Sequence, residues 1–135
     1  MREILFRGKR ADNSQWVEGH LMYKYHELSA FFVIGENVDE YTRVIPKTVG
    51  QFTGMTDSKS AKIFDSDILV IYIVREDGSE EKGMAKVIWD DHAFCIEAIS
   101  GNLCDAWLSL LGDRIVGQIC EFFVIGNTHD NPELL

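Results

Sequence analysis

Short apolar runs, each ended by a polar or glycine-containing turn, follow one another along the first third of the chain. The first is Ile4-Leu5-Phe6, and a second extends from Trp16 to Tyr23 with apolar residues on both faces. Two further runs cover residues 30–34 and 41–45, the last one ended by Pro46. Runs of this length between turn residues are typical of β-strands. The pattern therefore predicts four short strands before residue 46.

The second half of the chain carries longer strand signals. After an irregular segment from Pro46 to Phe64, apolar and β-branched residues dominate Ile68 to Arg75 and Met84 to Trp89. The connection contains Asp77-Gly78, a pair that favours a hairpin turn. Residues 94–99 and 116–125 continue the series. We expect an antiparallel meander followed by a final strand.

One helix is predicted between Asn102, whose side chain would cap the first turn, and Gly112, which would end it. Asp105 stands at the third helical position, where a carboxylate reaches back to the cap. Apolar residues recur at helical spacing, so one face would pack on the sheet; they are Leu103, Trp107, Leu110 and Leu111.

These elements predict a mainly β fold, a small barrel or roll with one short helix. A chain of 135 residues with 46% hydrophobic residues fits one domain that buries its own core. The longest apolar stretch, residues 68–74, is far shorter than the ~20 residues of a membrane helix. The three cysteines, Cys95, Cys104 and Cys120, lack C-x-x-C spacing. We therefore expect reduced thiols in a soluble, cytoplasmic protein.

Charge is distributed unevenly along the sequence. The chain has 13 basic and 22 acidic residues, which give a net charge of −9. Residues 1–60 hold eight of each sign, whereas residues 61–135 hold five basic and fourteen acidic residues. The whole excess therefore lies in the second half. Because sequence-independent binding of nucleic acid needs clustered Lys and Arg, the charge disfavours that function for the second half only and decides nothing for the first half.

A metal site is one chemical hypothesis. Asp90, Asp91 and His92, followed by Cys95, contain ligand types that bind zinc. No second pair of ligands completes a known spacing, and Asp is favoured in turns. A hairpin turn between two strands is the preferred interpretation, and we expect no metal.

A cysteine nucleophile is a second hypothesis. Cys104 would lie in the first turn of the predicted helix, where a thiol pKa falls, with His92 or His129 as base. The neighbouring Asp105 opposes ionisation of that thiol. Asp65 and Asp67 fit a turn entering a strand better than a catalytic pair, and the glycines form no phosphate-binding loop. We expect no catalytic residue and no cofactor.

A basic cluster near the N-terminus is the candidate binding site. Basic residues interleaved with aromatics bind single-stranded nucleic acid by stacking and phosphate contacts. A solvated strand and turn explains the same pattern without any ligand. The candidate binding residues are Arg2, Arg7, Lys9, Arg10 and Trp16.

Three blocks of sequence resemble the YopX family of phage and prophage proteins. The first runs from Arg2 to Gly19, with Asp12-Asn13 and Trp16-Val17 inside it. The second begins at Pro46-Lys-Thr-Val-Gly-Gln-Phe-Thr-Gly54 and leads through Asp57 to Asp67-Ile-Leu69. The third joins Val124-Ile-Gly-Asn127 to Asn131-Pro-Glu-Leu-Leu135. Ser14 and Ser66 stand where that family commonly has glycine.

The resemblance implies one family domain over residues 1–135. Within it, an N-terminal β segment would cover 1–61 and an SH3-like barrel 62–135. It also implies a phage or prophage origin and the cytoplasm of a bacterial host. The family carries no established activity, so the resemblance transfers no catalytic residue.

Three functional hypotheses follow from the sequence. The first is a non-catalytic interaction module that self-associates as a homo-oligomer and binds a protein partner from host or phage. The alternative is nucleic-acid binding through the basic N-terminal segment, and no membrane partner is expected. The third is a small metal or cysteine hydrolase around His92 and Cys104.

Overall fold

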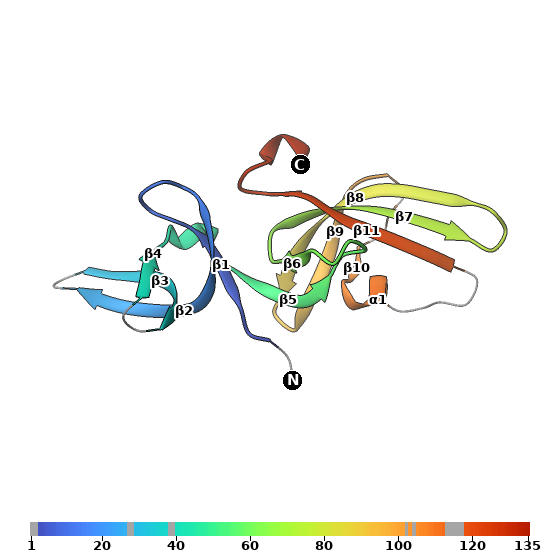
Figure 1. Cartoon of the computed structure of the whole chain (residues 1–135). Helices are drawn as coiled ribbons and strands as arrows, with labels where there is room; N and C mark the ends of the chain where they lie inside the picture. Colours follow the sequence, from blue (N-terminus) through green and yellow to red (C-terminus); the bar gives the residue numbers. More distant parts are fainter. Residues whose placement is uncertain (1–2, 27–28, 38–39, 102, 104, 113–117) are drawn as a thin grey trace. The chain divides into compact units, whose positions relative to one another are not determined.

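The computed structural model describes residues 3–26, 29–37, 40–101, 103, 105–112 and 118–135 (Figure 1). Strands dominate the described chain, which confirms the mainly β prediction. The chain divides into two compact units, Met1–Gly54 and Met55–Leu135, which are described separately below. The boundary between residues 61 and 62, expected from the resemblance within a single domain over 1–135, stays a prediction.

One sheet has six strands in the order β4-β3-β2-β1-β5-β6, and the pairs from β4 to β5 in this order are antiparallel. The four strands predicted before residue 46 are confirmed, although β1 begins two residues later than Ile4. The strands are β1 (Phe6–Lys9), β2 (Trp16–His26), β3 (Ser29–Asn37), β4 (Glu40–Arg43), β5 (Gly50–Thr56) and β6 (Lys62–Phe64).

The first unit is held together by backbone pairing between the ends of β1 and β4. Arg10 and Val44 form a bridge, and the Ala11 N–H donates to the Arg43 carbonyl at 2.9 Å. Val44 is 1% exposed and packs closely over Gly8, where an added Cβ would lie 3.1 Å from the Val44 Cβ. This pairing places the turn after β1 beside β4.

A short 3₁₀ helix, η1 (Pro46–Thr48), follows β4 and ties back to β1. The Thr48 hydroxyl donates to the Ile45 carbonyl at 2.6 Å and accepts the Lys9 N–H at 2.9 Å. Proline fits the first position of such a turn because its missing N–H would be unsatisfied there anyway. The sequence block that begins at Pro46 thus forms the turn after β4 and fixes it against β1.

The second unit is built on a five-stranded antiparallel sheet in the order β10-β9-β8-β7-β11. The hairpin predicted at Asp77-Gly78 joins β7 to β8, and the Arg75 N–H donates to the Ser79 carbonyl at 2.9 Å. The strands are β7 (Asp67–Arg75), β8 (Glu80–Asp90), β9 (Ala93–Gly101), β10 (Ala106–Trp107) and β11 (Gln118–Asn127).

One face of this sheet covers the hydrophobic core of the second unit. Alternate residues of β7, β8 and β9 point into it, as the period of two in a strand requires. Leu108 and Ile63 reach the same core from outside the sheet. The buried residues are Ile63, Leu69, Ile71, Ala85, Val87, Phe94, Ile96, Leu108 and Phe122.

Two expectations about this architecture are corrected. The described strands form open sheets, so the predicted small barrel is not closed, and β10 and β11 are the outer strands of the second sheet. The predicted helix over 102–112 is reduced to α1 (Ser109–Gly112). Residues 106 and 107 instead form β10, which pairs with β9. The proposed cap Asn102 lies outside the described residues.

The physical reason is visible at Asp105. Its carboxylate accepts a hydrogen bond from the Ala98 N–H of β9 at 2.8 Å. Asp105 therefore stabilises β9 and does not cap the start of a helix. Trp107 and Leu110, which were predicted to lie on the buried face of the helix, are 60% and 50% exposed. Leu108, which was not assigned to that face, is 2% exposed. The apolar residues follow the sheet edge and then a single helical turn.

The outer edge of β11 is covered by the turn at residues 57–61. The Phe122 N–H donates to the Ser58 hydroxyl at 3.0 Å, and the Ser58 N–H donates to the Phe122 carbonyl at 2.9 Å. The Val124 N–H donates to Asp57 Oδ2 at 2.9 Å. Because unpaired edge strands invite pairing with other chains, this turn protects part of β11.

Candidate functional site

The face of the β1–β2 hairpin gathers three of the predicted binding residues. The antiparallel register sets Lys9 opposite Trp16 and Arg7 opposite Glu18, so all four side chains leave the same face. The Arg7 guanidinium carbon lies 4.6 Å from the centroid of the Trp16 ring, and Lys9 Nζ lies 5.5 Å from it. Both distances suit cation–π interactions. The predicted grouping of Arg7, Lys9 and Trp16 is therefore present in the fold.

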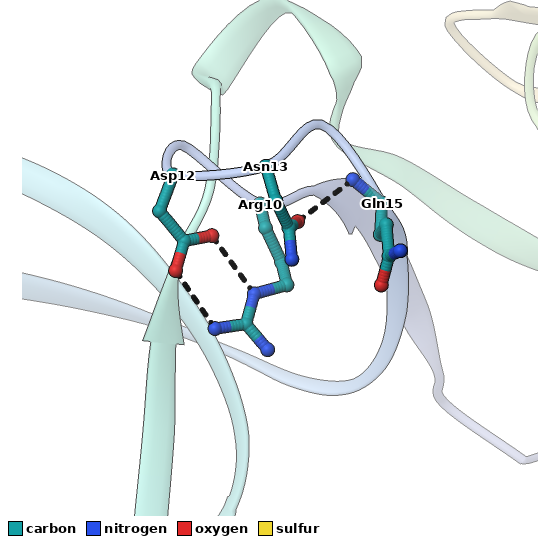
Figure 2. Close-up of polar contacts among 4 residues, drawn as sticks. All are labelled: Arg10, Asp12, Asn13 and Gln15. Carbon is teal, nitrogen blue, oxygen red and sulfur yellow. Dashed lines mark hydrogen bonds and ion pairs between the residues drawn. The ribbon is translucent and has the colours of Figure 1, made fainter.

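Arg10 belongs to a different environment in the turn beyond β1 (Figure 2). Its Nε and Nη2 atoms donate to the two carboxylate oxygens of Asp12 at 3.0 and 2.8 Å. The hydrogen bond and the charge of Asp12 raise the pKa of Arg10, and the hydrogen bond from Arg10 chiefly lowers the pKa of Asp12. Arg2, the remaining predicted binding residue, lies outside the described residues.

Side-chain and backbone hydrogen bonds fix the shape of this turn. The Gln15 N–H donates to Asn13 Oδ1 at 3.0 Å, as Figure 2 shows, and the Ser14 N–H donates to the Arg10 carbonyl at 3.0 Å. Ser14 adopts a φ of 60°, in the left-handed region. The turn thus presents Arg10 in a defined orientation.

A pocket of about 440 Å³ opens between this turn and β4. Its lining combines two arginines with an aspartate, a tyrosine and a threonine. Sequence reasoning missed this pocket, since no local pattern indicates that residues 10–12 and 41–43 lie together. The lining residues are Arg10, Ala11, Asp12, Tyr41, Thr42 and Arg43.

A second hollow, which we call the acidic groove, has a volume of about 230 Å³ and lies in the second unit. The Trp107 ring at its side is 60% exposed. Glu97 lies 3.2 Å from Lys86 Nζ, and Asp105 is held by the Ala98 N–H. The sequence pointed to it only through the acidic excess of residues 61–135. The groove is lined by Ile88, Asp90, Cys95, Ile96, Glu97, Asp105, Ala106 and Trp107.

The residues suspected of metal binding form a hairpin turn. Asp90 pairs with Ala93, so Asp91 and His92 make the two-residue connection between β8 and β9, and the His92 N–H donates to the Asp90 carbonyl. This confirms the turn interpretation. Among the residues that the structure describes, no three His, Cys, Asp or Glu side chains are arranged to hold a metal ion.

The described thiols are poorly suited to act as nucleophiles. Burial, together with the charge of Asp90 and a hydrogen bond to it, raises the pKa of Cys95, whose sulfur lies 3.9 Å from Asp90 Oδ2. Burial likewise raises the pKa of Cys120. A raised pKa keeps a thiol protonated and unreactive at neutral pH. Cys104, the suspected nucleophile, lies outside the described residues.

Asp67 has the structural role expected for the Asp65–Asp67 segment. Its Oδ2 atom accepts the Phe64 N–H at 2.7 Å, and the residue is 1% exposed. Ser66 between the two acids has a φ of 75°, a backbone conformation that glycine adopts more easily than serine. The prediction of a turn entering a strand is confirmed.

These observations define, for the described residues, a mainly β protein of two small units, each with a surface hollow, in which the most distinctive residues have strand and turn roles. A sequence model of the family described as YopX protein matches residues 5–135. The chain therefore belongs to the YopX family, as the resemblance of its sequence blocks predicted. No helix in the described part of the chain is long and apolar enough to cross a membrane.

One solved structure extends the comparison of folds. The crystal structure of protein EF1440 from Enterococcus faecalis matches with a TM-score of 0.53 and 24% sequence identity. The match covers 100% of this chain and 99% of that one. This likeness shows a shared fold. The comparison with curated proteins gave no match.

Proposed function

We propose that this YopX-family chain is a phage- or prophage-derived, non-catalytic interaction module that self-associates and binds a protein partner in the bacterial cytoplasm. The acidic groove carries the proposal, because Asp90, Glu97 and Asp105 line it beside the exposed Trp107. Carboxylates next to an indole ring favour Lys and Arg through ion pairs and cation–π contacts. The partner therefore presents a basic segment.

The charge of the second half supports this partner chemistry. Residues 61–135 carry the entire net charge of −9, which attracts basic proteins and repels phosphate backbones. The SH3-like character that the family resemblance suggests for residues 62–135 fits a binding role by analogy alone.

The test measures binding of a fluorescent deca-arginine peptide to the full chain by anisotropy. We expect Trp107→Ala and Asp90→Asn each to weaken binding about tenfold, the scale of losing one charge-assisted or cation–π contact. Asp91→Asn is the matched control, because it removes the same charge one residue outside the groove lining. Equal weakening by Asp90→Asn and Asp91→Asn would show that only overall charge matters and would contradict a groove.

Self-association is supported by exposed apolar side chains on β10 and α1. Trp107 and Leu110 are 60% and 50% exposed, and large exposed apolar residues are enriched at protein interfaces. We expect sedimentation of the full chain to show a concentration-dependent oligomer that Leu110→Glu dissociates. A strict monomer at all concentrations would remove this part of the proposal.

Nucleic-acid binding through the first unit is the second candidate, and the stacking of Arg7 and Lys9 on Trp16 favours it. Two cations beside an aromatic ring resemble the elements of a single-strand binding surface. The double variant Arg7→Glu with Arg10→Glu is expected to abolish retention of single-stranded DNA or RNA. Unchanged retention would exclude this candidate.

A further inference from the structure

The sheet of the second unit carries apolar side chains on both of its faces. Leu69 and Ile71 of β7 point into the core, whereas Val70 and Tyr72, at the alternate positions, leave the opposite face, which we call the outer face. A sheet with one solvated face normally alternates apolar and polar residues. The unbroken apolar run over residues 68–74 is instead typical of a strand that is covered on both sides.

The strands on either side of β7 extend this apolar surface. Phe123 of β11 and Met84 of β8 both stand opposite Val70. The Phe123 ring meets the Tyr72 ring edge-on, with the centroids 6.2 Å apart. Tyr72 is 37% exposed, and the other three side chains are half-buried. A contiguous apolar patch of this kind marks an interaction surface, whereas single exposed apolar residues do not.

The outward-facing residues of β8 form a self-complementary row on the outer face. The buried residues of this strand occupy the alternate positions, so the row reads Lys82, Met84, Lys86, Ile88 and Asp90. If two copies of β8 stack antiparallel about Lys86, Lys82 of one copy faces Asp90 of the other, and Met84 faces Ile88. Each pairing then occurs twice, as a twofold axis requires.

The charges in this row suit such a pairing. Lys82 Nζ lies 5.3 Å from the centroid of the Tyr72 ring, a contact that holds the side chain on the outer face without neutralising it. Lys86, which meets its own copy at the centre, is paired with Glu97 at 3.2 Å. Within the described part of the chain, neither Lys82 nor Asp90 forms an ion pair.

The net charge of −9 opposes contact between two copies of this chain. Two copies can therefore associate only through a surface on which both signs of charge occur and apolar area is available. The outer face meets both conditions. Its aligned packing on a second outer face, about 10 Å away, would bury the apolar side chains of β7, β8 and β11 between the sheets.

We propose that two copies of the chain form a symmetric dimer through the outer faces of their second sheets, with β8 antiparallel to β8 of the partner and Lys82 of each copy against Asp90 of the other. This inference rests on the proposed self-association and names its surface. Because Asp90 also lines the acidic groove, the dimer covers one side of that groove.

The experiment measures the dimer dissociation constant of the full chain by sedimentation. Lys82→Glu and Asp90→Lys are each expected to weaken the dimer at least about tenfold, because each sets two pairs of like charges face to face. An equimolar mixture of the two variants is expected to regain the wild-type affinity, since every facing pair is then of opposite sign. The chain that carries both changes regains it for the same reason.

Lys47→Glu and Glu3→Lys are the matched controls, since they make the same charge reversals at exposed positions of the first unit. Both are expected to leave the dissociation constant unchanged. Recovery in the mixture separates the contact from misfolding, because two misfolded variants do not restore each other.

Three outcomes overturn the proposal. Unchanged association of Lys82→Glu and Asp90→Lys, in a chain that Leu110→Glu dissociates, places the interface at β10 and α1 and leaves the self-association standing. Weakened variants that do not recover when mixed show that only net charge or folding has changed. A wild-type chain that is a strict monomer overturns both this surface and the self-association.

Discussion

Ser14 and Ser66 adopt backbone conformations that glycine enters far more easily. Their φ values are 60° and 75°, and both residues stand at turns. A side chain in the left-handed region costs roughly 1 kcal/mol because its Cβ approaches the following carbonyl oxygen. Ser14 and Ser66 therefore keep these turn geometries at a cost in stability.

Ser66→Gly is expected to raise the free energy of unfolding by about 0.5–1 kcal/mol, since it removes this Cβ conflict while keeping the backbone bonds of the turn. Thermal denaturation followed by circular dichroism measures the change. Gly78→Ala is the control in the opposite direction, because Gly78 has a φ of 85° and nothing lies within 4 Å of an added Cβ. This variant should lower the free energy of unfolding through backbone strain alone. A loss of stability in Ser66→Gly would contradict the interpretation.

Asp57 is a buried carboxylate whose charge is balanced by the backbone. Burial alone would raise its pKa, but hydrogen bonds from the N–H groups of Val124, Ala61 and Lys59 outweigh it, and the pKa lies below 3.8. The residue is 7% exposed and joins the 57–61 turn to β11. One side chain thus connects segments that are 67 positions apart.

The pKa shift of Asp57 predicts a defined pH dependence. Because the folded-state pKa is depressed, its contribution to stability is complete above the unfolded value near 3.8 and is lost as pH falls through the folded value. Asp57→Asn is expected to lower the free energy of unfolding by about 1–3 kcal/mol at neutral pH. It also removes this part of the acid sensitivity.

Urea denaturation at pH 7 and at pH 3 measures both effects of Asp57→Asn. Glu76→Gln, an exposed change of the same charge, serves as control and should alter neither value by more than about 0.5 kcal/mol. An Asp57→Asn variant that keeps the full acid sensitivity would refute the assignment.

At the scale of elements, strands and their hairpin partners were predictable, whereas pairings between distant segments were not. The four early strands, the β7–β8 hairpin and the Asp90–His92 turn follow from local patterns of apolar residues and turn formers. The prediction of a helix over 102–112 was wrong because the Asp105 carboxylate accepts a hydrogen bond from the Ala98 N–H of β9. Ala98 lies seven residues earlier in the chain, and helical spacing does not encode a contact of this kind. Local sequence fixes the type of an element only where tertiary contacts agree with it.

The end of β11 and the tail after it form a second interlocked element. A β-bulge lies between Val124 and Gly126, and a Cβ added at Gly126 would clash with Asn131 Oδ1. That oxygen accepts the Asn127 N–H at 3.2 Å, while η2 (Pro132–Leu134) closes the chain. The third block of the family resemblance therefore contains both Gly126 and Asn131, whose side chain packs over this glycine.

Gly126→Ala is expected to destabilise the chain by about 1–3 kcal/mol through overpacking. Asn131→Ala alone should cost about 1 kcal/mol for the lost hydrogen bond. The double variant should cost less than the sum, because removing the Asn131 side chain relieves the clash. Urea denaturation of all four proteins gives the coupling, and strict additivity would show that the two residues do not interact.

For the whole molecule, the candidate sites were only half predictable. The contact of Arg7 and Lys9 with Trp16 follows from hairpin register, which alternation along two strands nearly fixes. The placement of Arg10 beside Arg43 and Tyr41 depends on pairing between distant segments, and the acidic groove depends on β10 replacing a helix. The residues that carry the family resemblance lie in strands and in the turns that join them, so they identify the fold more readily than the activity.

The order of strands in the second sheet has a consequence for synthesis on the ribosome. β7, the first strand of this sheet to emerge, pairs with β11, the last, and about 40 residues separate the two. At roughly 5–20 residues per second, β7 waits about 2–8 s with one edge open before its partner is made. During that interval the apolar strand from Ile68 to Val74 is the part of the nascent chain most exposed to aggregation and to chaperones.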